Sequence, residues 1–220
     1  ELTKIYSVAG ELPANTSLIT SRPFRSPHHT ASGVALVGGG TNPRPGEISL
    51  AHRGVLFLDE FAEFPRQVLE NLRQPLEDGV IHVSRAACNI NFPAKFILIA
   101  ATNPCPCGFA GDSEKNCICS PLQTINYKKK ISGPILDRID LHIEVPRVKF
   151  DKLTSIDNSE KSQIIKERVQ QARKIQQKRF INLPFITNSE MSSEAVKKFC
   201  QLDNISINLM RNAVEQMHLS

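Results

Sequence analysis

Several features that would assign this sequence to a class at once are missing from it. No apolar run approaches the roughly 20 residues that a membrane-spanning helix needs, and no signal peptide is recognisable. We therefore expect a soluble, cytoplasmic protein with no membrane partner. A G-x-x-x-x-G-K-[ST] phosphate loop is also missing, because the glycine cluster Gly38–Gly40 has no lysine after it.

The 220 residues are 40% hydrophobic, which is enough for one domain or for a large domain with a small one. The net charge of +5 permits contact with nucleic acid, although an ordinary solvated surface with a slight lysine excess explains it equally well. The chain opens at Glu1 rather than Met, and Ser220 follows directly on a helical pattern. We expect either a piece of a longer protein or a gene remnant.

The first two thirds of the chain carry the pattern of an α/β protein. Short apolar runs followed by polar residues predict strands of a parallel sheet that are buried on both faces. Between the strands we expect a helix that Pro75 ends or kinks, and a hairpin. The expected strands are 55–58, 95–103 and 138–146, the helix is 64–77 and the hairpin is 79–92. Gly, Pro and His interrupt residues 20–53, which we expect to be a loop region.

After Pro146 the pattern becomes helical, so we place a domain boundary near residue 147. A long helix is predicted over 160–179, with an apolar stripe on one face and Lys, Arg and Gln on the others. The stripe consists of Ile164, Ile165, Val169, Ala172 and Ile175. Shorter helices are expected over 192–201 and 205–218, so this part is predicted to be a small helical bundle.

Asp59 and Glu60 follow directly on the apolar run 55–58. Side chains at the carboxyl end of a parallel strand project into the crevice where ligands bind. A carboxylate there suits magnesium, and a second one can polarise an attacking water. The same pair also suits the first turn of a helix, where acidic residues are favoured.

Two further polar residues fit the same chemistry. Asn103 ends the strand predicted over 95–103, where its amide could orient the water, although Asn before Pro is also a common turn. Arg138 lies between Asp137 and Asp140 and could neutralise phosphate charge in a neighbouring subunit. A local ion pair with those aspartates is the alternative.

Four cysteines form a compact cluster, Cys105, Cys107, Cys117 and Cys119, in the pattern C-x-C, nine residues, C-x-C. In a reducing cytosol such a set is more often a metal site than two disulfides. Four thiolates suit a structural zinc ion, although this spacing is not the commonest one. Cys88 and Cys200 stand alone and are expected to be small buried hydrophobic residues.

Basic and imidazole side chains gather in the loop region and at the hairpin tip. They are candidates for contacts to the phosphate backbone of DNA, and contacts inside the protein are the alternative for the loop. The candidates are Arg22, Arg25, His28, His29, Arg44 and Arg85.

Four stretches together resemble the magnesium-chelatase-like AAA+ ATPases of the YifB/ComM competence-protein type. They are "RPFRSPHHTASGVALVGGGTNPRPGEISLAHRGVLFLDEF", "LRQPLEDG", "ATNPCPCG" and "ISGPILDRIDLHIEVP". The similarity covers nearly the whole chain. In this resemblance Asp59 and Glu60 match the Walker B pair, Asn103 matches sensor 1, and Arg138 matches the arginine finger.

The resemblance implies an AAA+ parallel sheet over 1–146 and a helical lid over 147–220, in a hexameric ring with ATP and Mg²⁺ at its interfaces. It places 20–50 and 79–92 as inserts facing a pore for nucleic acid, and it implies DNA branch migration during transformation. The family's first strand, phosphate loop and sensor 2 do not match any part of this chain, so we expect the 220 residues alone to bind ATP poorly. The alternatives are an inactive remnant or binding module, and a chelatase-type motor acting on a protein.

Overall fold

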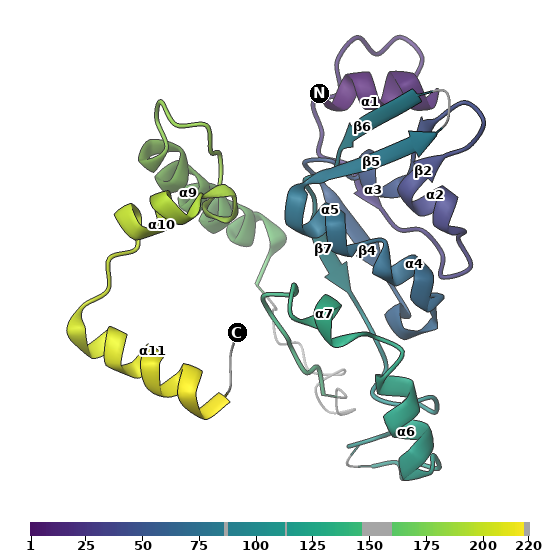
Figure 1. The fold of residues 1–220 in the computed structure, drawn as a ribbon, viewed down its shortest axis with the longest axis vertical. Coiled ribbons are helices and arrows are strands. Elements are labelled where there is room, and N and C mark those ends of the chain that lie inside the picture. The colour runs from purple at the N-terminus through teal and green to yellow at the C-terminus, as the bar shows by residue number, and fades with distance from the viewer. Residues whose placement is uncertain (86–87, 113, 147–159, 218–220) are drawn as a thin grey trace. The chain divides into compact units, whose positions relative to one another are not determined.

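The computed structural model describes residues 1–85, 88–112, 114–146 and 160–217, and side chains at 85, 88 and 217 are left out of the description. The chain divides into two compact units, Glu1–Arg147 and Val148–Ser220 (Figure 1). Among the described residues, no helix has both the length and the apolar character that crossing a membrane requires.

A three-stranded parallel sheet positions the candidate site in the first unit. Its strands are β1 (Phe24–Arg25), β4 (Val55–Leu58) and β7 (Ile97–Ala100), in the order β1-β4-β7. Leu58 at the end of β4 pairs with Ala100 at the end of β7. Because the strands are parallel, their carboxyl ends lie at the same edge. Gly54 permits the close approach to β1, since a Cβ there would lie 2.1 Å from the Pro23 carbonyl oxygen.

One face of this sheet is covered by the hydrophobic core. Leu56 and Leu58 of β4 are fully buried, and short helices and a hairpin pack over them. The covering helices are α2 (Gly33–Val37), α3 (Glu47–Leu50), the 3₁₀ turn η1 (Phe61–Glu63), α4 (Arg66–Glu70) and α5 (Arg73–Asp78). On the other face, Ile97 and Ile99 are about half exposed. The prediction that 95–103 is buried on both faces is therefore wrong, since the described residues cover only one.

The helix predicted over 64–77 is present but broken. It forms α4 and α5, with a turn at Asn71 and Leu72 between them. Pro75 explains the break, because its ring conflicts with the carbonyl group four residues earlier, at Asn71. The kink therefore lies one turn before the proline that causes it.

The predicted hairpin is confirmed as β5 (Val80–Arg85) paired antiparallel with β6 (Cys88–Pro93). The loop region 20–53 contains more regular structure than expected. Besides β1, α2 and α3 it forms a small ribbon of β2 (Gly38–Gly39) and β3 (Arg44–Pro45). Gly38, Gly39 and Gly40 all have positive φ, so the glycine cluster shapes a tight turn.

The third predicted strand, 138–146, is wrong. Residues 141–146 have no regular structure, and Leu141, Ile143 and Val145 are about 80% exposed. These residues alternate with polar ones as in a strand, but a strand also needs hydrogen bonds from a neighbour. No described strand pairs with this segment, so it does not form a strand despite its alternating pattern. The same unit also contains α1 (Leu2–Ala9), α6 (Pro121–Lys128) and α7 (Gly133–Leu136).

The described part of the second unit is helical, as predicted. It contains α9 (Ser162–Arg179), the 3₁₀ turn η2 (Asn188–Glu190), α10 (Ser193–Phe199) and α11 (Asn204–Met217). Asp203 caps α11 by accepting a hydrogen bond from the Ser206 N–H at 2.7 Å. Phe180 is buried and lies edge-on to Phe185 and Phe199.

Candidate nucleotide and metal sites

Asp59 and Glu60 lie just beyond the carboxyl end of β4, with both side chains exposed. The Asp59 carboxylate accepts a hydrogen bond from the Glu60 N–H at 2.8 Å. Glu60 has a left-handed backbone, with φ of 50° and ψ of 44°. A residue other than glycine rarely adopts this conformation, and such strain clusters at functional sites. This sharp turn places the carboxylates of Asp59 and Glu60 at the end of β4, where one could bind a metal ion and the other could contact a water molecule.

His29 contacts one of these carboxylates. Its Nδ1 lies 2.8 Å from Glu60 Oε2, and its ring packs edge-on against Phe64. The His28 ring stacks on His29 with 4.1 Å between centroids, and His28 Nδ1 lies 2.9 Å from the Thr30 hydroxyl. The histidine pair therefore joins the loop after β1 to Glu60.

The ends of β4 and β7 are hydrogen-bonded to each other beyond the sheet. The Ala101 N–H donates to the Leu58 carbonyl oxygen at 3.0 Å, and the Phe61 N–H donates to the Ala101 carbonyl oxygen at 2.8 Å. Asn103 is exposed and follows Ala101 by two residues. Asp59, Glu60 and Asn103 therefore lie along one edge, which we name the catalytic edge after the role proposed for it.

Arg138 is engaged inside the first unit. Its guanidinium forms an ion pair with Glu77 of α5 and a hydrogen bond with the Pro134 carbonyl oxygen. The ion pair of Arg138 is with Glu77 and not with Asp137 or Asp140. The described contacts do not bring Arg138 to Asp59 or Glu60.

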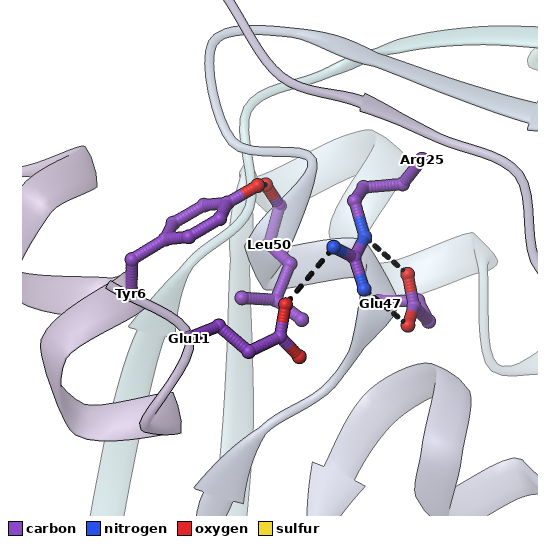
Figure 2. Close-up of polar contacts among 5 residues, drawn as sticks. All are labelled: Tyr6, Glu11, Arg25, Glu47 and Leu50. Carbon is purple, nitrogen blue, oxygen red and sulfur yellow. Dashed lines mark hydrogen bonds and ion pairs between the residues drawn. The ribbon is translucent and has the colours of Figure 1, made fainter. Parts of the chain in front are cut away.

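Arg25 joins β1 to α3 and to the loop after α1 (Figure 2). Its guanidinium makes two hydrogen bonds of 2.6 Å to the Glu47 carboxylate and one of 3.0 Å to Glu11. Nearby, the Tyr6 hydroxyl donates to the Leu50 carbonyl oxygen. The Glu47 carboxylate raises the pKa of Arg25 further above its usual range. These contacts fit the alternative of a role inside the protein for Arg25.

The other basic candidates differ in their surroundings. Arg22 is exposed and donates to the Arg53 carbonyl oxygen at 2.8 Å. Arg44 is exposed on β3. Arg85 ends β5, and its side chain lies outside the described part of the structure. Arg22 and Arg44 are therefore the exposed arginines of the loop region.

The four predicted cysteine ligands converge. The sulfur of Cys105 lies 3.4 Å from that of Cys107 and 3.7 Å from that of Cys117, and Cys107 and Cys117 are 3.6 Å apart. The Cys119 sulfur completes a group whose atoms all lie within 4.8 Å of one another. A zinc ion with Zn–S bonds of about 2.3 Å separates its four sulfurs by about 3.8 Å. The cluster therefore fits a mononuclear tetrahedral ion, and its sulfurs are too far apart to be disulfides.

The cysteines differ in acidity. The backbone N–H of Phe109 lowers the pKa of Cys107 to about 6, because it stabilises the thiolate. Burial and the neighbouring sulfurs raise the pKa of Cys119 to about 12. Four adjacent thiolates repel one another, so a cation is needed to deprotonate the whole set.

Comparison with known proteins identifies the family of this chain. Residues 1–153 match the family described as "Magnesium chelatase, subunit ChlI", and residues 159–220 match its C-terminal part. The chain belongs to the magnesium chelatase ChlI family. It is an AAA+ type family, which implies ATP and Mg²⁺ as cofactors.

Three similar curated proteins come from bacteria. "Competence protein ComM" of Haemophilus influenzae is 46% identical over 90% of this chain and 38% of its own length. The uncharacterized protein YifB of Escherichia coli is 48% identical over 83% of this chain and 35% of its own. The uncharacterized Mycobacterium tuberculosis protein Rv2897c is 42% identical over 100% of this chain and 43% of its own. The chain thus spans about two fifths of the length of these relatives.

Two of the contacts involve carboxylates that the sequence did not single out. Glu47 holds Arg25 and Glu77 holds Arg138, whereas the contact of His29 with Glu60 joins two residues that were both candidates. Glu77 lies in the "LRQPLEDG" string that carries the ChlI resemblance, which is a signal of its importance. No spacing rule connects Glu47 with Arg25, because they are 22 residues apart and on different elements.

Proposed function

We propose that this chain is part of a ComM/YifB-type ATPase that couples ATP hydrolysis to DNA remodelling, including branch migration. The observation that supports it most is the catalytic edge, where Asp59 and Glu60 follow β4 and Asn103 follows β7. Membership of the ChlI family and the similarity to the competence protein ComM point to the same activity.

In this proposal each polar residue of the edge has its own role. Asp59 would hold the magnesium ion of Mg-ATP, which supplies positive charge against the phosphates when bound. Glu60 accepts a proton from the attacking water, and His29 orients the Glu60 carboxylate through their 2.8 Å contact. Asn103 orients the same water from the neighbouring strand. The G-x-x-x-x-G-K-[ST] pattern of a phosphate loop does not occur in these residues. In this proposal, the rest of the nucleotide site is supplied by a longer form of the protein or by another chain.

The proposed assembly is a ring of copies of this chain, with ATP between neighbours. Arg138 would reach the phosphates of the adjacent copy after leaving Glu77. Arg22, His28 and Arg44 are exposed on the loop region and are the proposed DNA contacts, together with Arg85 at the hairpin. Such contacts give an affinity that falls steeply with salt.

The test is ATP turnover by the protein at its native length, with and without branched DNA, over a range of salt concentrations. We expect ATP hydrolysis that DNA stimulates, with the stimulation lost as salt rises. Hydrolysis that a protein partner stimulates and DNA does not would favour the chelatase-type motor. Absence of hydrolysis at native length would favour the binding module, and either result would contradict the proposal.

A further inference from the structure

In the sequence, the four-cysteine cluster lies between Asn103 and helix α6. Cys105 is fully buried and comes two residues after Asn103. Cys119 directly precedes Ser120, which caps α6. The Ser120 hydroxyl accepts from the Gln123 N–H, while the Gln123 side chain accepts from the Ser120 N–H at 2.8 Å. This capping box fixes the start of α6 two residues after the last thiol.

The far end of α6 returns to the segment that follows Glu60. Lys130 Nζ lies 2.9 Å from the Glu63 carboxylate and 5.1 Å from the centre of the Tyr127 ring. Tyr127 is buried, and burial raises its pKa, while the nearby Thr102 and Glu63 side chains also influence it. Residues from both strand ends therefore meet α6.

The described residues between Asn103 and Lys130 thus form a strap that leaves the catalytic edge after β7 and returns to it after β4. Within this strap, the hydrogen-bonded turns around Gly108 and Asp112 join residues of the strap to one another. We propose that a zinc ion bound by Cys105, Cys107, Cys117 and Cys119 closes this strap and thereby positions Asn103 at the catalytic edge. The activity part of this inference rests on the proposed ATPase function.

The donor set indicates which role such an ion has. Four thiolates fill a tetrahedral coordination shell and leave no position for a water. The ion would therefore take no part in hydrolysis, and its contribution would be geometric. A displacement of about 1 Å at a catalytic group can lower a rate by about 100-fold, so a closed strap matters for turnover more than for nucleotide affinity.

The first experiment measures metal content. The native-length protein, purified without chelator, should contain one zinc per chain by elemental analysis, and Cys107→Ser should contain less than a tenth of that. Cys200→Ser is the matched control, because Cys200 is exposed in the second unit and belongs to no ligand cluster among the described residues. Iron in place of zinc, or no metal in the wild-type protein, would overturn the assignment.

The second experiment measures position without relying on activity. Removal of zinc by a chelator should increase amide hydrogen exchange at residues 101–103 by at least tenfold, and added zinc should restore protection. Lys130→Gln should keep the zinc and still increase exchange there, because it releases α6 from Glu63. Unchanged exchange at 101–103 after zinc loss would overturn the positioning role, whether or not the protein hydrolyses ATP.

The third readout separates this inference from the proposed function. In an active protein, zinc removal should lower kcat by about 10-fold to 100-fold and leave the ATP dissociation constant within about twofold. An active protein whose kcat does not respond to zinc loss would contradict the inference alone. A zinc-loaded protein with zinc-dependent protection and no ATPase activity would contradict the proposed function alone.

Discussion

The two units differ in how their apolar side chains are covered. In the first unit, Leu36, Leu56, Leu69 and Ile135 are almost completely buried in one continuous core. In the described part of the second unit, α9 and α11 expose most of their large apolar residues, including the predicted stripe of α9. The difference indicates that the catalytic edge rests on a core that the first unit supplies itself.

Truncation of an apolar side chain should show the largest difference in stability between the two units. Leu56→Ala removes buried methyl groups beneath the sheet, where it should cost about 2–5 kcal/mol of unfolding free energy. Ile175→Ala on α9 is the matched change, and because Ile175 is 60% exposed it should cost less than about 0.5 kcal/mol. Hydrogen exchange resolved by unit is the measurement. Equal losses for both variants would break the comparison.

Removal of an ion pair should show the same contrast with a smaller effect. Arg25→Met leaves the Glu47 carboxylate without its two charged hydrogen bonds in a largely buried position (Figure 2), which should cost about 1.5–3 kcal/mol. Arg168→Met breaks the exposed pair with Glu160 in the second unit and should cost less than about 1 kcal/mol. Denaturant midpoints of the two variants test this. A larger loss for Arg168→Met would contradict it.

A pH effect should be confined to the first unit and be the smallest of the three. Burial lowers the pKa of His52, against the opposing effect of Glu1. Its Nδ1 accepts the Lys95 N–H at 3.1 Å, which a protonated ring cannot do. The unfolded chain therefore takes up this proton first, near pH 6.5, so stability is full above that pH and falls below it.

The control for this pH effect is His52→Asn, whose side-chain oxygen can still accept a hydrogen bond but does not titrate. Its stability should be lower at every pH and should fall less between pH 6.5 and 5 than that of the wild-type protein. Glu1 and Arg53 face the same ring and are unchanged in both proteins. Equal slopes in the two proteins would exclude His52 as the source.

The sequence predicts the elements whose signals are local. The apolar run before Asp59, the hairpin and the helices of the second unit all form, and the four cysteines converge as expected. These signals survive because each depends on periodicity or on residues close together in the chain. Asp59 and Asn103 could also be assigned to one edge, since strand ends in a parallel sheet coincide.

The failures concern interactions between distant segments. Residues 138–146 have the pattern of a strand, but no described strand pairs with them, and pairing cannot be read from the segment alone. Arg25 has the sequence context of a surface residue, yet Glu47 and Glu11 hold it inside the first unit. The exposure and the ion-pair partners of a side chain depend on residues that are distant in the sequence, so composition alone does not reveal them.

The most direct test of the proposed function is the rate of ATP hydrolysis by the native-length protein and its Glu60→Gln variant. Glutamine keeps the shape of the side chain and its contact to His29 but cannot accept the proton of the water. We expect the variant to bind ATP with unchanged affinity and to hydrolyse it at least about 100-fold more slowly. A variant that hydrolyses ATP at the wild-type rate would show that the catalytic edge is not the site of the chemistry.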